Sequence, residues 1–275
     1  MSGRDLNLRG GWALVRRTWF SWMQHRGFFF LLAFSWMMPM LIYLFVWSQA
    51  AGGGAGGGAG GTIGGLTRSD LVTYYLVLIL VNQLAFCTNN WTVGDGIRYG
   101  RMNFLLLRPM SPVYDALASE VAGKVVFMTF ALPVTGVLAL ILRPELNVAW
   151  RDVGLFVPAL ALAWMLRFVW GYWLALLAFW ATRADALLSL QESLIFLLAG
   201  QVAPPTLLPA PMQALATVLP FRYMLGFPVE VLLGQLDGAQ LRAGFAFQTG
   251  WLAVAAALFV ALWWAGTRRY TAVGG

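Results

Sequence analysis

The chain has 275 residues, of which 60% are hydrophobic and only 11% are charged, and its formal net charge is +7. A soluble domain of this size could not bury so much apolar surface, so the composition excludes an ordinary soluble protein. Apolar runs of about 20 residues with few charges are long enough to cross a hydrocarbon core of ~30 Å. The composition therefore predicts an all-α, polytopic membrane protein with a single transmembrane domain over residues 1–275.

The charge and the scarcity of metal-binding side chains limit the function further. In a membrane protein, excess positive charge is expected on the cytoplasmic side and does not by itself indicate nucleic acid. One cysteine, Cys87, and one histidine, His25, cannot form an intrachain disulfide or a Cys/His metal site. The chain also contains no His-Glu-x-x-His, Gly-x-Ser-x-Gly or Walker A motif. We therefore expect no catalytic residues, no metal and no cofactor in this chain, and no enzyme activity of its own.

The first 27 residues predict a helix that lies along the membrane surface. Trp12, Trp19 and Trp22 recur at helical spacing, and positive charge surrounds them at Arg9, Arg16, Arg17 and Arg26. A helix rich in Trp and Arg is favoured in the headgroup plane, where its apolar face is buried. We therefore expect residues 1–27 to form an amphipathic interfacial helix on the cytoplasmic side.

Six apolar runs follow and predict six transmembrane helices, at 28–47, 71–92, 125–142, 153–181, 186–203 and 247–266. With the N-terminus inside, twelve Lys and Arg residues lie on the cytoplasmic side and five on the outer side. Because positive residues are retained in the cytoplasm, both termini are expected there.

A basic, amphipathic segment separates the second and third predicted spans, within the cytoplasmic loop 93–124. Gly96 and Gly100 permit the sharp turns that a short helix needs. The apolar and positive side chains could dock a partner protein or lie on anionic lipid headgroups. The candidate docking residues are Ile97, Arg98, Arg101, Phe104, Leu105, Leu106, Leu107 and Arg108.

The region 204–246 lies between the last two predicted spans. Its prolines break any helix, and the apolar pieces between them are too short to span a membrane yet too apolar for an ordinary exposed loop. Broken backbone at membrane depth is tolerated where it packs against protein. We therefore predict a re-entrant or interfacial hairpin on the outer face, with Pro204, Pro205, Phe221, Arg222 and Tyr223 as its candidate residues.

Two ionisable residues, Arg167 and Glu192, fall within predicted spans, as do the amides Asn82 and Gln83. Arg167 and Glu192 each cost at least ~2.5 kcal/mol there unless they are paired or hydrated. They could face a transport pathway or pair across the bundle. Alternatively, Arg167 bonds backbone carbonyls and Glu192 pairs with an interfacial arginine. A direct pair requires tilted helices, because Arg167 is expected to lie deeper. Asn82 and Gln83 are expected to form interhelical hydrogen bonds or to join the same pathway.

Taken together, these features resemble the permease subunits of bacterial type-2 ABC exporters. The resemblance covers essentially the whole chain, and the segments that carry it are 95–100 (DGIRYG), 107–112 (LRPMSP), 219–223 (LPFRY), 227–230 (FPVE) and 268–275 (RRYTAVGG). It implies that the N-terminal helix is an elbow helix and that residues 94–122 hold coupling helices for a nucleotide-binding subunit. It also favours docking over a lipid-surface role for this segment.

The resemblance further implies partners and a location. Two permeases, identical or paralogous, would pair with two ATP-binding subunits, which bind ATP and Mg²⁺, in the bacterial cytoplasmic membrane. The resemblance says almost nothing about the substrate, but an aromatic, weakly charged membrane interior suits a lipid-like, amphipathic or drug-like compound, including a hydrophobic cation. A secondary transporter would instead show an internal repeat, and no convincing repeat is present. A membrane scaffold without transport activity is a further alternative.

Overall fold

The computed structural model describes residues 8–52, 61–108, 111–145, 148–181 and 184–269, which form helices and no β-strand. Helices are the expected outcome for these apolar runs, because backbone groups in hydrocarbon must find their hydrogen bonds within the chain. The prediction of an all-α membrane protein is therefore confirmed.

Five helical stretches among the described residues are long and apolar enough to cross a membrane. They comprise α2 (Arg26–Ala51), α3 with α4 (Arg68–Ala85 and Asn89–Arg98), α6 (Pro112–Leu142), α7 with the 3-10 turn η1 (Trp150–Leu176 and Leu177–Phe179) and α12 (Gly238–Arg269).

The predicted fifth span, 186–203, differs from the structure. It corresponds to α8, Ala184–Leu198, whose 15 residues rise only ~22 Å, less than a hydrocarbon core of ~30 Å. The chain turns away at Gly200, which has a φ of 88°. A Cβ there would lie 2.0 Å from the Tyr74 hydroxyl oxygen. The described chain thus has five candidate spans and a shorter α8, where the sequence predicts six spans.

Three other boundaries differ from the prediction, and one of them is the sixth predicted span, 247–266, because α12 already begins at Gly238, inside the predicted outer region 204–246. The second predicted span, 71–92, is interrupted, because α3 ends at Ala85, Phe86 is extended and α4 begins only at Asn89. The third, 125–142, begins much earlier, at Pro112, where a proline is favoured in the first turn. The predicted loop 93–124 is therefore largely helical and includes the short helix α5, Met102–Leu106.

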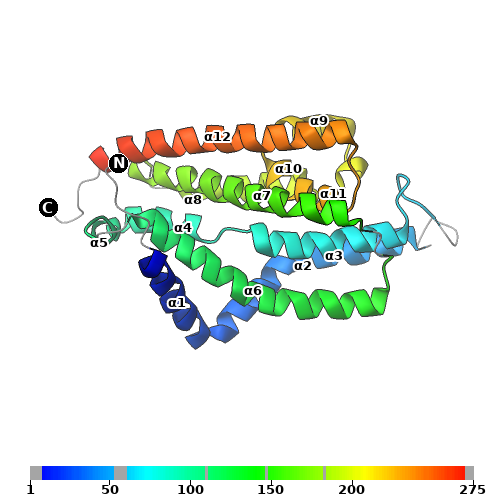
Figure 1. Ribbon diagram of the computed structural model, residues 1–275, viewed down its shortest axis with the longest axis horizontal. Coiled ribbons are helices and arrows are strands. Elements are labelled where there is room, and N and C mark those ends of the chain that lie inside the picture. The colour runs from blue at the N-terminus through cyan, green and yellow to red at the C-terminus, as the bar shows by residue number, and fades with distance from the viewer. Residues whose placement is uncertain (1–7, 53–60, 109–110, 146–147, 182–183, 270–275) are drawn as a thin grey trace.

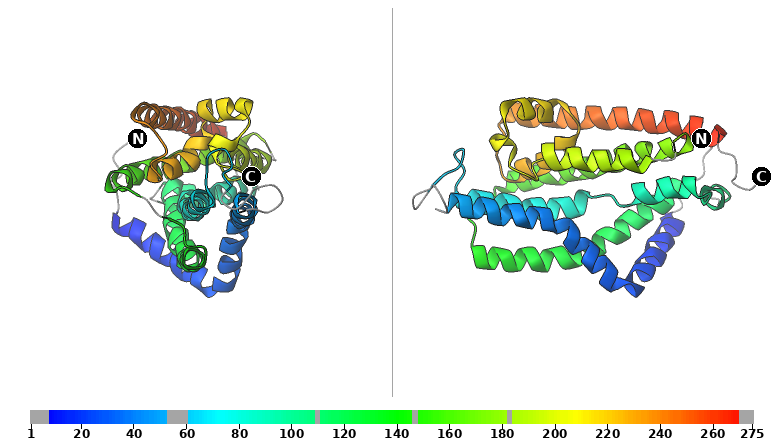
Figure 2. Two further views of the ribbon diagram at one scale, coloured as in Figure 1. Left: turned by 90° about the vertical axis from the view of Figure 1, so that its right-hand side faces the viewer. Right: turned by 180° about the vertical axis from the view of Figure 1, so that it is seen from behind.

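The helix α3 lies at the centre of the bundle, against α2, α6, α7 and the short helix α11 (Gly226–Leu232) (Figures 1 and 2). In the most apolar stretch of the span formed by α3 and α4, 78% of residues are buried, against 11% in α12 and 22% in α6. The outer helices thus present exposed apolar side chains, as expected for helices that face lipid.

The first helix, α1 (Leu8–Gln24), is set at an angle to the bundle and packs on α6 (Figure 1). Trp22 stacks on Phe29 with ring centroids 4.2 Å apart. A side chain at Gly123 of α6 would approach the Trp22 ring to 2.7 Å, so the glycine permits this contact.

Short helices gather at the end of the bundle opposite α5 (Figure 1). They are η2 (Pro205–Leu207), α9 (Ala210–Val218), α10 (Phe221–Met224) and α11 (Gly226–Leu232). Both α10 and α11 are buried against α7, and they also contact α8 and α3, respectively. They therefore close this end of the bundle with protein.

Candidate functional site

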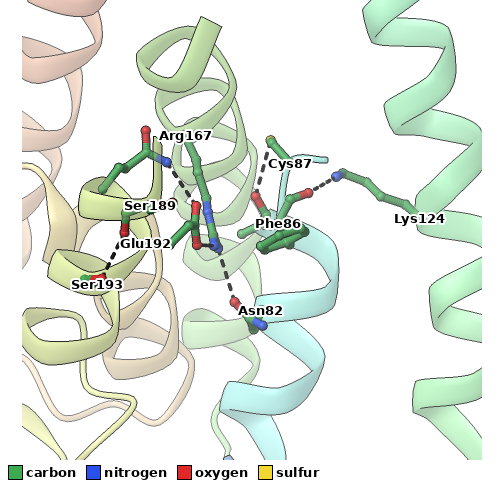
Figure 3. Close-up of polar contacts among 10 residues, drawn as sticks. Asn82, Phe86, Cys87, Lys124, Arg167, Ser189, Glu192 and Ser193 are labelled. Atoms are coloured by element: carbon green, nitrogen blue, oxygen red, sulfur yellow. Dashed lines mark hydrogen bonds and ion pairs between the residues drawn. The ribbon is translucent and has the colours of Figure 1, made fainter. Parts of the chain in front are cut away.

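Arg167 lies at the centre of a buried polar cluster formed by α3, α7 and α8. Its side chain is 1% exposed. The guanidinium donates one hydrogen bond to Glu192 at 2.6 Å and another to Asn82 at 3.1 Å. It also lies over the Phe86 ring, 4.7 Å from the centroid (Figure 3). A charge held away from water is tolerated only with such partners, so this cluster compensates the buried charge of Arg167, although its Nε has no hydrogen-bond partner among the described residues.

The positions of the helix ends explain why Arg167 and Glu192 meet. The helix α7 ends at Leu176 and α8 begins at Ala184, so both residues lie two to three turns from the same connection. The sequence places the end of the fourth span at residue 181 and the start of the fifth at residue 186. With these later boundaries, Arg167 is expected to lie farther from the connection, and so deeper in the membrane, than Glu192. The direct pair is one of the alternatives left open by the sequence, and the structure selects it.

The break between α3 and α4 lies beside this cluster. Lys124 of α6 donates to the Phe86 carbonyl oxygen at 2.8 Å and pairs with Glu120 at 3.3 Å. Figure 3 shows Lys124 and Arg167 approaching Phe86 from opposite sides. The last carbonyls of a helix lack partners within that helix and carry partial negative charge. Lys124 therefore stabilises the C-terminal end of α3 through the Phe86 carbonyl.

Gln83, the fourth polar residue predicted for this site, belongs elsewhere. Its side-chain amide donates to the Ala33 carbonyl oxygen at 3.1 Å and ties α3 to α2. The structure thus brings Asn82, Arg167 and Glu192 together and gives Gln83 an interhelical bond.

A cavity of about 500 Å³ opens beside the cluster. Arg167, Glu192 and Asn82 contribute to its wall, and the aromatic lining consists of Trp36, Phe86, Trp91 and Phe196. The cavity is open to the outside rather than enclosed. Pockets of this size commonly accept small molecules, with apolar walls for contact and a few polar groups for orientation.

Sequence reasoning missed the aromatic wall and Lys124. The chain has 14 Trp and 19 Phe residues, so nothing distinguishes the lining rings from ordinary packing. Glu120 and Lys124 did offer a signal, because a Glu–Lys pair four residues apart supports a helix. That pair indicates that α6 begins before residue 125.

The predicted docking residues lie at the end of the bundle occupied by α5. Leu107 is 84% exposed, Phe104 70% and Leu106 41%, whereas Ile97 is buried and Leu105 half-buried. Arg98 and Arg101 are also exposed, while Arg108 pairs with Asp115 at 3.3 Å. Ile97 and Leu105 thus anchor the segment, and we call the exposed set Arg98, Arg101, Phe104, Leu106 and Leu107 the α5 surface.

The predicted hairpin residues lie at the opposite end. Arg222 forms two hydrogen bonds with Glu230, at 3.1 and 2.5 Å. Burial lowers the pKa of Arg222, but the bonds and charge of Glu230 outweigh it and raise the pKa. The Tyr223 hydroxyl donates to the Thr217 carbonyl at 2.6 Å, and Phe221 is buried.

Pro204 and Pro205 lead into η2 beside these residues. Gln248 of α12 donates to the carbonyl oxygens of Tyr223 and Ala159, both at 3.0 Å. These bonds tie the short helices to the spans.

Within the described residues, no His, Cys, Asp and Glu side chains form a group that could hold a metal ion. The helical bundle, its five candidate spans and its internal polar cluster define an all-α, multi-pass membrane protein.

Comparison with known protein families gives a more specific assignment. A family model described as ABC-2 family transporter protein matches residues 30–274. Since the match covers most of the chain, the chain belongs to this family and is a membrane component of an ABC-2 transporter. No curated protein and no solved structure matches it in the corresponding searches.

Proposed function

We propose that this chain is the permease subunit of an ATP-driven exporter in the bacterial cytoplasmic membrane. Membership of the ABC-2 family supports a transport role with a separate ATP-binding partner. ATP and Mg²⁺ would be bound by that partner. Two permeases, identical or paralogous, would assemble with two ATP-binding subunits and move a lipid-like, amphipathic or drug-like compound.

The observation that carries this proposal is the α5 surface. Its three apolar side chains are exposed beside Arg98 and Arg101, while Ile97 and Met102 fix the segment to the bundle. A group of exposed apolar side chains with neighbouring charge is typical of a protein-binding site. A nucleotide-binding subunit on this surface would pass its movements to α4, and α4 leads directly to the break beside Arg167.

The distribution of charge supports a cytoplasmic location for the α5 surface. The beginning of α1 and the end of α12 lie at the same end of the bundle as α5 (Figure 1). That end carries Arg98, Arg101, Arg108, Arg268 and Arg269. Positive residues favour the cytoplasmic side, so the short helices α9 to α11 would form the re-entrant hairpin on the outer side.

Co-purification in mild detergent tests this proposal. We expect a nucleotide-binding subunit with ATPase activity to accompany the wild-type chain. Leu107→Asp should abolish its association, because the substitution places a carboxylate in an apolar contact. Trp150→Asp is a matched control, because Trp150 is 90% exposed at the opposite end, where an acidic residue suits the first turn of α7. Retention of the ATPase by Leu107→Asp would contradict docking at the α5 surface.

The break between α3 and α4 favours one alternative function, a secondary transporter. Such transporters commonly bind substrate at discontinuous helices near the middle of the membrane. Substrate flux into proteoliposomes with an ion gradient and without ATP would support this alternative. ATP-dependent flux that requires the co-purified subunit would exclude it.

A further inference from the structure

The charged group that is accessible from the cavity is the Glu192 carboxylate. The Glu192 side chain is 28% exposed, whereas Arg167 is 1% exposed and lies behind it. The Arg167 guanidinium is also engaged by Asn82, by Glu192 and by the face of Phe86. A molecule in the cavity would therefore approach the carboxylate more closely than the guanidinium.

The Glu192 carboxylate is held in place and keeps capacity for another donor. One oxygen accepts a hydrogen bond from Arg167 at 2.6 Å and the other from Gln191 at 3.1 Å. A carboxylate can accept about four hydrogen bonds, so these two leave room for a ligand. The support from both neighbours fixes the carboxylate without occupying it completely.

Aromatic rings form much of the remaining cavity wall, together with Ser193, Leu197 and Gln201. Trp36 comes from α2, Trp91 from α4 and Phe196 from α8. Aromatic faces attract cations through their quadrupole, and tryptophan does so most strongly. An aromatic wall next to a carboxylate is complementary to a positively charged molecule with apolar substituents.

We propose that this cavity binds an apolar cation of drug-like size, with Glu192 as its counter-ion and Trp36 and Trp91 as its aromatic contacts. The volume of about 500 Å³ suits a molecule of that size. The inference deepens the proposed export function, because it names the substrate class and rests on the cavity belonging to the transport path. The ligand would enter with its charge towards Glu192, and the Arg167–Glu192 pair would persist.

Equilibrium binding to the purified permease without its ATPase tests this site. The probe is tetraphenylphosphonium, and tetraphenylborate has nearly the same shape with the opposite charge. We expect saturable binding of the cation and binding of the anion weaker by about tenfold or more. Glu192→Gln should weaken cation binding by a similar factor, and Glu192→Asp should retain much of it. Glu145→Gln, which removes an exposed carboxylate elsewhere, should leave binding unchanged.

Other outcomes would overturn the proposal. Equal binding of both ions would show an apolar groove that does not select charge, and undiminished binding by Glu192→Gln would show that the cation binds elsewhere. If Glu192→Gln is not monodisperse, Leu197→Trp is the variant to measure. The larger side chain occupies space in the cavity, and the Arg167–Glu192 pair is unchanged. That variant must lose cation binding.

The design also separates this site from the proposed coupling to an ATPase. Leu107→Asp should bind the cation normally even though it loses the ATPase. If only the cavity variants lose cation binding, the result supports the substrate site. If only Leu107→Asp loses the ATPase, the result supports docking at the α5 surface.

Discussion

The Arg167 side chain makes contacts that another basic residue could not reproduce. Its planar guanidinium reaches Asn82 and Glu192 through different nitrogens while its face covers the Phe86 ring. Lysine presents a single compact ammonium, so it could not make all three contacts together. The arginine therefore joins α3, α7 and α8 at one point.

Replacing Arg167 with methionine should destabilise the protein strongly. Arg167→Met leaves the Glu192 charge and the Asn82 amide without their partner, which costs about 3 kcal/mol or more in a buried pair. The double variant Arg167→Met/Glu192→Leu removes both charges and should recover much of this loss. Thermal unfolding in one detergent measures both. A double variant no more stable than Arg167→Met would show that the pair does not account for the cost.

At the level of elements, the sequence predicts helices well and their interruptions poorly. Long apolar runs identify α2, α6, α7 and α12, because few other structures satisfy the backbone in lipid. The break at Phe86, Cys87 and Thr88 contains neither proline nor glycine. It is stabilised by Lys124, which is distant in sequence, so no local signal reveals it.

The early end of α8 has a local cause that the sequence shows only in part. Gly200 is visible as a glycine, but its positive φ and the contact with Tyr74 follow from the packing of α8 on α3. The Tyr74 hydroxyl donates to the Gly200 carbonyl at 3.0 Å. This bond and the left-handed backbone together hold the chain in its turn.

Gly200→Ala should therefore lower the free energy of unfolding by about 2 kcal/mol or more, because the added Cβ is strained at this φ and displaces the Tyr74 hydroxyl. Gly136→Ala is the matched control. Its Cβ would meet no atom within 4 Å in α6, so this change should be neutral or slightly stabilising. Thermal unfolding of the two variants gives the comparison, and equal stabilities would refute the role of Gly200.

At the scale of the whole molecule, the two ends of the bundle differ in charge and in packing. One end carries the exposed α5 surface with several arginines, and the other is closed by α9, α10 and α11. The positions of the arginines and of the prolines along the chain predict this difference between the two ends, because both can be read from the sequence alone. The meeting of Arg167, Asn82 and Glu192 depends on helix ends and neighbours, so the sequence left it as one of several alternatives.

Cysteine labelling should establish the orientation of the bundle. In a Cys87→Ala background, Glu145→Cys should react with a membrane-impermeant maleimide in intact cells. Leu107→Cys should react only after the membrane is opened, because positive residues favour a cytoplasmic α5 surface. The reverse pattern would place the α5 surface outside and would exclude docking of a cytoplasmic ATPase there.

The bond between Lys124 and the Phe86 carbonyl has a chemical consequence. Lys124 is the only lysine in the chain, and its ammonium is held by the Phe86 carbonyl and by Glu120. An acylating reagent attacks the free, deprotonated amine, so Lys124 should be protected while these bonds persist. The protein thus carries one side-chain amine, and the rate at which it acquires a mass tag would report how often Lys124 leaves the Phe86 carbonyl and Glu120.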